Sequence, residues 1–297
     1  MTAVEDYALP QAQRDLPSYG PESHKYTHGT LLVTGGSRQY SGAPMLSAIA
    51  GLYAGAGVVV ACLPESARHP GACPFALIVH RVPDDPARGV FCGASLSAWQ
   101  KELPKATALV LGPGMGNHPE VDVFLAEALA VPRPKVVDAD ALNCISRVPA
   151  LLPGDATLRR NMVLTPHDGE ARRLCRAFGV PEELERAERT LALAAATGCV
   201  VVGKGAGTLV ATPEGTLTRN ASGNPRLATA GSGDVLSGVI GALLSQGLAS
   251  ETAARLGAFL HGVAADNAKG AFLADDLCRL VGDAMVALRN DTLPPES

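Results

Sequence analysis

The sequence predicts an α/β fold in which a mostly parallel sheet carries helices on both faces. Short runs of β-branched and apolar residues alternate with stretches that repeat apolar residues at helical spacing, a pattern typical of parallel sheets. Gly and Pro are also abundant, with 32 and 22 of the 297 residues. Many of the glycines follow directly after predicted strands, where open parallel sheets bind their ligands.

The expected elements alternate along most of the chain. Residues 1–22 are polar and contain prolines, which predicts a loose or docked arm, and residues 23–292 are expected to form one three-layer domain. The expected strands are 30–34, 58–63, 108–111, 135–138, 162–164 and 200–202, with a hairpin over 209–218. The expected helices are 44–57, 120–130, 169–178, 181–197, 234–248 and 252–268.

Charge and cysteine content disfavour several classes of protein. The formal net charge is −4, and the bases are scattered, which argues against a nucleic-acid surface. No run approaches 18 uninterrupted apolar residues, so we expect no membrane partner. The first residues carry acids where a signal peptide needs bases. The seven cysteines form no Cys-x-x-Cys pair, and Cys62 and Cys199 lie in apolar runs. Together these features predict buried free thiols in the cytoplasm.

A glycine loop opens directly into the long apolar helix expected after residue 233. The backbone amides of Gly231, Ser232 and Gly233 are expected to form an anion hole, aided by the positive end of the helix dipole. Asp234 is either an N-cap that stabilises the helix by about 1 kcal/mol, or a general base beside a phosphoryl group. Because a simple cap does not require three small residues before it, we favour the base.

Lys204 ends a predicted strand and begins a glycine-rich turn over residues 204–208. Together with Gly198 the segment nearly matches the P-loop pattern. We exclude a P-loop because the four intervening residues are a strand and because Gly205 stands where Ser or Thr would bind magnesium. Two interpretations stay open: the turn holds phosphates by another geometry, or it is a tight hairpin with a solvated lysine.

Acidic and histidine side chains follow two other predicted strands. Asp138 and Asp140 could bind metal or ribose, or could cap the following helix, and the cap is favoured. His167 and Glu170 follow a strand that Pro166 ends, and they could face the same cleft, although a loop histidine is more often a surface residue.

Two further observations concern His261 and two catalytic motifs. His261 falls on an apolar helix face and is expected in the core. Gly-x-Ser-x-Gly and His-Glu-x-x-His motifs are absent from the sequence, which disfavours hydrolase and zinc-enzyme functions.

Six motifs occur in a recognisable order. They are Gly35-Gly36-Ser37 with Gly42-Ala43, Gly112-Pro-Gly-Met-Gly116, Val137-Asp-Ala-Asp-Ala-Leu-Asn143, Thr165-Pro-His-Asp-Gly-Glu170, Lys204-Gly-Ala-Gly-Thr208 and Asn224-Pro-x-Leu-Ala-Thr-Ala-Gly-Ser-Gly-Asp234. They resemble the ribokinase-like fold and, more closely, the ADP- or ATP-dependent NAD(P)H-hydrate dehydratase family. The resemblance covers about residues 23–290. The chain length leaves no room for the epimerase domain fused to some members, so we expect the stand-alone form.

The resemblance implies a kinase step within a repair reaction on hydrated NADH or NADPH. The nucleotide's terminal phosphoryl group goes to the hydroxyl of the damaged ring, and elimination of phosphate restores the double bond. Asp234 would be the base and touch the substrate. The residues that would hold the nucleotide are Lys204, Gly205, Ala206, Gly207, Thr208 and Gly233. Those that would line the hydrate pocket are Ala43, Gly114, Gly116 and His167.

The resemblance also implies cofactors and an assembly. Glu170 would position Mg²⁺ through water, the co-substrate would be ADP or ATP, and we expect a homo-oligomer, a tetramer. The chain departs from the family pattern at Tyr26, which follows His24-Lys25 where glycine is frequent. It departs again at Asp168, which replaces a frequent proline and adds a charge near the cleft.

Two other functions stay open at the level of sequence. The first is a kinase of a small hydroxyl-bearing substrate, such as hydroxyethylthiazole or a sugar, on the same fold. The second is a nucleotide-binding sensor without chemistry. Asp234 argues for an enzyme, because a protein that only binds has little use for a carboxylate beside a phosphate site.

Overall fold

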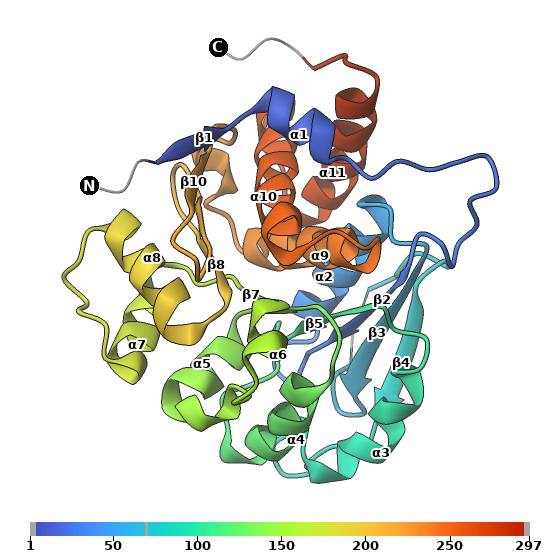
Figure 1. Cartoon of the computed structure of the whole chain (residues 1–297). Helices are drawn as coiled ribbons and strands as arrows, with labels where there is room; N and C mark the ends of the chain where they lie inside the picture. Colours follow the sequence, from blue (N-terminus) through green and yellow to red (C-terminus); the bar gives the residue numbers. More distant parts are fainter. Residues whose placement is uncertain (1–3, 69–70, 294–297) are drawn as a thin grey trace.

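The computed structural model describes residues 4–68 and 71–293 and arranges ten strands in one sheet (Figure 1). From one edge to the other the strands are β1 (Glu5–Tyr7), β10 (Leu217–Asn220), β9 (Leu209–Ala211), β8 (Val200–Gly203), β7 (Met162–Leu164), β6 (Lys135–Val137), β5 (Ala108–Leu111), β2 (Thr30–Thr34), β3 (Val58–Pro64) and β4 (Ile78–Val82). Strand β9 is antiparallel to both of its neighbours, and the other pairs are parallel. The predicted mostly parallel sheet is confirmed.

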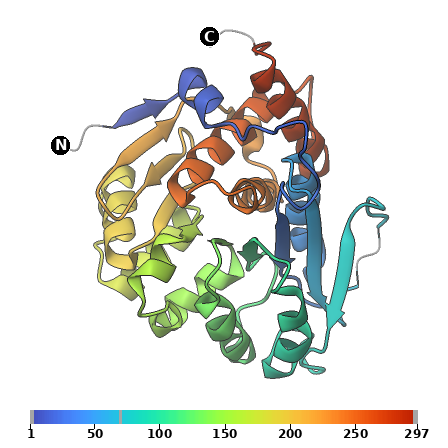
Figure 2. The ribbon, with the colours of Figure 1, turned by 45° about the vertical axis from the view of Figure 1, so that its right-hand side comes forward.

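Helices cover both faces of this sheet (Figures 1 and 2). One face carries α2 (Gly42–Tyr53), α9 (Ser232–Ser245), α10 (Ser250–Asp266) and α11 (Ala274–Arg289). The other face carries α3 (Leu96–Trp99), α4 (Pro119–Ala130), α5 (Asp140–Arg147), α6 (Ala156–Arg160), α7 (Asp168–Phe178) and α8 (Arg186–Thr197). Within the described ranges, the helices are too short or too polar to cross a bilayer.

Two hydrophobic cores form because successive strand residues point to opposite faces. In β2, Leu31 and Val33 enter the core under α2 and α9, whereas Leu32 enters the core under α4 and α5. Strands buried on both faces have no polar side to display, which is why they appear in the sequence as continuous apolar runs.

Several elements differ from the sequence prediction. The helix expected from Pro181 begins at Arg186, because the carbonyl and carboxylate of Glu182 accept hydrogen bonds from Arg189 and Arg176 and hold a non-helical turn. The edge strand β4 and the last helix α11 were not predicted. Strand β4 exposes Ile78 to solvent and so lacks a buried apolar run.

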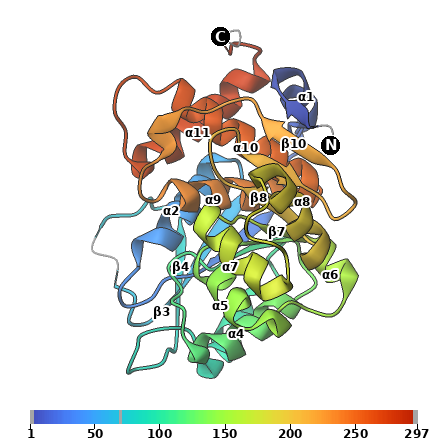
Figure 3. The same ribbon diagram turned by 90° about the vertical axis from the view of Figure 1, so that its left-hand side faces the viewer.

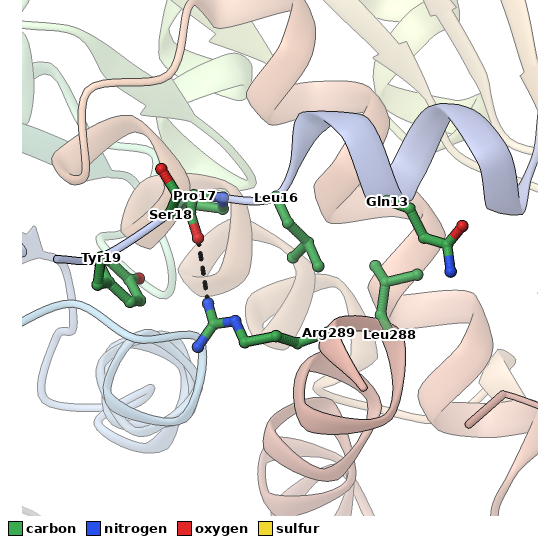
Figure 4. A pocket seen from close by; sticks show the side chains of 7 residues that line it. All are labelled: Gln13, Leu16, Pro17, Ser18, Tyr19, Leu288 and Arg289. Carbon is green, nitrogen blue, oxygen red and sulfur yellow. Dashed lines mark hydrogen bonds between the residues drawn. The ribbon is translucent and has the colours of Figure 1, made fainter. Parts of the chain in front are cut away.

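The N-terminal arm docks on the domain. Strand β1 extends the sheet by pairing with β10, and α1 (Leu9–Asp15) packs against α10 and α11 (Figures 1 and 3). Beyond α1, Arg289 of α11 donates to the carbonyl of Pro17 at 3.2 Å and lies over the Tyr19 ring (Figure 4). The Tyr19 ring also stacks on His28. Of the two states left open for the arm, the docked one is observed.

A close crossing of α2 and α9 sets the geometry of the site and can be tested by substitution. A Cβ on Gly238 would lie 2.0 Å from the carbonyl oxygen of Ser47, so Gly238→Ala must push the two helices apart. We expect it to lower the free energy of unfolding by about 1–3 kcal/mol in urea denaturation. Gly154→Ala is the control, because no atom lies within 4 Å of its Cβ position. Equal stability of both variants would contradict the close crossing.

Candidate active site

Four charged side chains gather where β6, β7 and β8 end beside the first turn of α9. Because these strands are parallel neighbours, Asp138, Glu170 and Lys204 follow their carboxyl ends in that order across the sheet. The Lys204 ammonium lies 2.9 Å from Asp138 Oδ1 and 3.9 Å from Glu170 Oε2. Its Nζ is also 3.2 Å from the position a Cβ would take on Gly233. Lys204 therefore joins the strand ends to the glycine loop.

Lys204 is not a solvated hairpin lysine. Its side chain is only 18% exposed. Burial by itself would lower the pKa of Lys204, but the carboxylates of Asp138 and Glu170 outweigh burial and raise the pKa above its usual value. The ammonium therefore stays charged at the base of the site.

The favoured cap interpretation of Asp138 is wrong. Ala139 is the N-cap of α5, and its backbone has a φ of +51°, a conformation that is strained for a residue other than glycine. The Asp138 carboxylate is 1% exposed and accepts from Lys204 and, at 2.5 Å, from the hydroxyl of Ser237 in α9. Asp140 instead accepts from the Gly116 amide at 2.8 Å. Sequence reasoning missed Ser237, whose only signal was a polar residue four positions after Gly233.

The amino end of α9 needs glycine for two reasons. Gly231 has a φ of +86°, and a Cβ there would lie 2.6 Å from Leu46. Asp234 is in the first turn, where the Ser47 hydroxyl donates to its carbonyl at 2.8 Å. Burial, reinforced by the charge of Asp138, raises the pKa of the Asp234 carboxyl to about 7. Such a group can take up and release a proton near neutral pH.

The residues expected to line the hydrate pocket meet at the same edge of the sheet. A Cβ on Gly114 would lie 3.3 Å from Cβ of Ala43 and 2.5 Å from the carbonyl oxygen of Tyr40, so this loop lies against the start of α2. Ala43 is one turn before Ser47, which contacts Asp234. The structure thus brings Ala43 and Gly114 near the candidate base, and Gly116 is tethered to Asp140.

His167 and Glu170 form a capping box at the start of α7. The Glu170 carboxylate accepts from the His167 amide at 2.9 Å, and His167 Nδ1 accepts from the Gly169 amide at 3.0 Å. The neutral ring therefore carries its proton on Nε2, which is 3.4 Å from Glu170 Oε1. Burial raises the pKa of Glu170 to about 7 and, with help from Lys204, lowers the pKa of His167. The imidazole is 56% exposed and can meet a ligand.

An arginine that sequence reasoning missed holds the turn after Lys204. The Arg186 guanidinium donates to the carbonyls of Ala206 and, at 2.8 Å, Gly207. Gly205 has a φ of +150°, and a Cβ there would lie 2.2 Å from Arg186 Nη1. Thr208 closes the turn by donating to the Gly205 carbonyl at 3.1 Å. Nothing in the local sequence pattern indicates that Arg186, 18 residues before Lys204, reaches this turn.

Two other predicted residues have defined partners. Asp168, the departure from the family pattern, forms ion pairs with Arg172 and Arg189, so its added charge is compensated. The pKa of the Asp168 carboxyl is lowered by the hydrogen bond from Arg172. His261 is buried as expected, and its ring contacts Ser232 in the glycine loop.

This fold and site define the chain as a ribokinase-like protein. A ribokinase-like superfamily protein from Enterococcus faecalis has the same fold, with a TM-score of 0.82 over 96% of both chains at 23% identity. More narrowly, residues 31–284 match the family model described as NAD(P)H-hydrate dehydratase. The chain belongs to that family, as its motifs predicted.

Named relatives of this chain support the same assignment. An ADP-dependent (S)-NAD(P)H-hydrate dehydratase from Neisseria meningitidis is 40% identical over 82% of this chain and 79% of its own length. A bifunctional NAD(P)H-hydrate repair enzyme from Moorella thermoacetica is 38% identical over 88% of this chain. The present chain spans 50% of that bifunctional relative.

Solved structures of the family are also similar. The ADP/ATP-dependent NAD(P)H-hydrate dehydratase from Bacillus subtilis, co-crystallised with ATP and Mg²⁺, has a TM-score of 0.78 at 27% identity. The match covers 97% of this chain and all of that one.

The raised pKa of Asp234 predicts a pH-dependent stability. An aspartate has an ordinary pKa of 3.8, so the folded protein holds this proton more tightly than the unfolded chain does. Ionisation therefore destabilises the fold increasingly from about pH 4 to pH 7. Asp234→Asn should match the wild-type melting temperature at pH 4 and exceed it by about 2–5 °C at pH 8. A variant that melts lower at pH 8 would contradict the raised pKa of this partly buried carboxyl.

Proposed function

We propose that the chain dehydrates hydrated NADH and NADPH, with ADP or ATP as the phosphoryl donor. Family membership supports the reaction class. The single observation that carries the mechanism is the partly buried Asp234 carboxyl in the first turn of α9, beside Gly233 and the Lys204 ammonium. A general base with a pKa of about 7 is suited to removing a proton from an alcohol as it attacks phosphorus.

The proposed reaction has two steps. Asp234 takes the proton of the ring hydroxyl, the hydroxyl oxygen bonds to the terminal phosphorus, and AMP or ADP leaves. Inorganic phosphate then leaves the ring carbon while the neighbouring carbon loses a proton, which restores the double bond. Lys204 and the amides at Gly231 and Gly233 offset the negative charge on the transferring group. The turn over residues 205–208 is proposed to hold the rest of the nucleotide.

The surroundings of Glu170 fit a magnesium ion that is held mainly by the phosphates of the nucleotide. Mg²⁺ usually keeps several waters and takes one or two carboxylates together with substrate phosphates. One oxygen of Glu170 already accepts from the His167 amide, which suits contact through water rather than direct coordination. When bound, Mg²⁺ neutralises charge on the phosphates, while Glu170 and Lys204 orient the waters and the phosphate oxygens.

The carboxyl ends of β2 and β5 supply the proposed hydrate pocket. Ala43 and Gly114 leave room for a flat ring because one has a methyl group and the other no side chain. His167 is proposed to line the pocket with its 56% exposed ring, whose Nε2–H lies 3.4 Å from Glu170 Oε1. In this proposal the hydrate pocket and Lys204, where the proposed nucleotide turn begins, both lie beside Asp234.

The test of the proposal is restoration of NADH. The purified chain is incubated with hydrated NADH, Mg²⁺ and either ADP or ATP, and the return of the nicotinamide absorbance is followed. We expect recovery with at least one nucleotide, together with release of phosphate. A stable phosphorylated product instead would identify a small-molecule kinase, and absence of turnover with both nucleotides would refute the proposal.

Asp234→Asn separates an enzyme from a sensor. Because the amide cannot accept the hydroxyl proton, we expect kcat to fall by about 10²–10⁴-fold. ADP affinity measured by calorimetry should change by less than about threefold, since Lys204 and the 205–208 turn are intact. Asp283→Asn in α11, whose carboxylate is exposed and pairs with Arg279, is the matched control and should keep full activity.

We also propose that the protein acts in the cytoplasm as a homotetramer. All seven cysteines are unpaired thiols, which supports a reducing compartment. Exposed Phe75 and Ile78 near the edge strand β4 give the chain apolar surface for association. Light scattering of the purified chain would give the mass of the assembly directly.

A further inference from the structure

A histidine outside the proposed reaction contacts the glycine loop from behind. His261 lies in the middle of α10 and is 7% exposed. Its Nε2 is 3.0 Å from the carbonyl oxygen of Ser232 and 3.1 Å from the hydroxyl oxygen of the same residue. The sequence predicts only a core position for His261, and the proposed reaction does not use it.

The carbonyl contact is the basis for assigning the ring proton. A carbonyl oxygen can only accept, so its 3.0 Å contact with Nε2 is a hydrogen bond only when Nε2 carries hydrogen, and we assign that tautomer. Burial lowers the pKa of His261 to about 4, so the ring is neutral at physiological pH and has one N–H group. With that hydrogen on Nε2, the nitrogen cannot accept from the Ser232 hydroxyl. The hydroxyl hydrogen is therefore available to a different acceptor.

Ser232 is itself only 5% exposed, and its hydroxyl, rather than its backbone amide, is the group through which we infer that it donates to a ligand. The Ser232 amide lies 3.3 Å from the Thr229 carbonyl and closes the turn before α9. This modifies the expected anion hole, in which Ser232 was to contribute its amide. The hydroxyl lies in the first turn of α9, the same turn as Asp234.

The helix that carries His261 is fixed to the neighbouring loop. Asn220 donates to the Ala258 carbonyl at 3.0 Å, and Ser222 donates to the Phe259 carbonyl at 2.8 Å. Asp266, at the end of α10, accepts from the Gly223 amide at 2.7 Å. These bonds hold α10 against the loop, so the N–H group of His261 has a fixed position relative to Ser232.

We propose that His261 is a positioning residue that orients the Ser232 hydroxyl as a hydrogen-bond donor to the transferring phosphoryl group. The imidazole donates to the Ser232 carbonyl and excludes the hydroxyl from using the ring as its acceptor. The inference rests on the proposed phosphoryl transfer, and Ser232 supplies one donor to it.

Two amide substitutions separate this role from simple packing. The side-chain nitrogen of Gln occupies the place of histidine Nε2, whereas that of Asn occupies the place of Nδ1. We expect His261→Gln to keep kcat within about threefold of wild type. We expect His261→Asn to lower kcat about tenfold, less than the 10²–10³-fold cost of deleting a donor, because the hydroxyl is misdirected rather than removed. Melting temperature checks that both variants fold.

A double-mutant cycle with Ser232→Ala tests whether His261 acts through the Ser232 hydroxyl. If His261 acts through the hydroxyl, His261→Asn should cause no further loss of kcat once Ser232 is alanine. Independent losses that multiply, equal kcat for the Gln and Asn variants, or a wild-type kcat in His261→Asn would each overturn the inference.

The ADP dissociation constant tests the role of His261 independently of the dehydratase reaction. We expect the ADP dissociation constant to rise about threefold in His261→Asn and to stay unchanged in His261→Gln, because the same hydroxyl meets the terminal phosphate. A wild type that binds ADP but does not restore NADH would refute the proposed reaction alone. In that event, equal ADP affinity in both variants would refute the role of His261.

Discussion

The buried ion pair between Lys204 and Asp138 is the contact on which the rest of the site depends. It joins the ends of β8 and β6 across β7, and the second oxygen of Asp138 binds Ser237 of α9. Removing one partner of such a pair leaves an uncompensated buried charge, at a cost of about 3–5 kcal/mol. The carboxylate therefore fixes, in one place, the lysine, the strand ends and the helix that carries Asp234.

Burial and charge explain why the pKa values in this cluster are shifted. The carboxyl groups of Asp138, Glu170 and Asp234 surround one ammonium, and water is too scarce to solvate all of them as anions. Glu170 and Asp234 consequently have pKa values raised to about 7, while Lys204 keeps its proton. A group can exchange protons with a substrate at neutral pH only when its ionised and neutral forms are close in free energy.

The abundance of glycine follows from how closely the backbone segments approach one another. A Cβ on Gly35 would lie 2.3 Å from the Pro113 carbonyl, and one on Gly112 would lie 2.0 Å from the Asp138 carbonyl. These contacts draw the loops after β2, β5 and β6 together at one edge of the sheet. Side chains there would hold the loops apart and enlarge the space in which the ring and the phosphate are proposed to meet.

The sequence alone determined most of the alternating strands and helices, although not β4 or α11, together with the glycine loops and the family motifs. Those features are local, because strand runs, helix periods and turn chemistry depend on near neighbours along the chain. Only the tertiary structure decided that Lys204 pairs with Asp138, that Arg186 holds the glycine-rich turn after Lys204 and that His261 lies behind Ser232. These contacts join residues 66, 20 and 29 positions apart. Their distances depend on how the sheet stacks its strands and crosses its helices, and no periodicity in the sequence records that geometry.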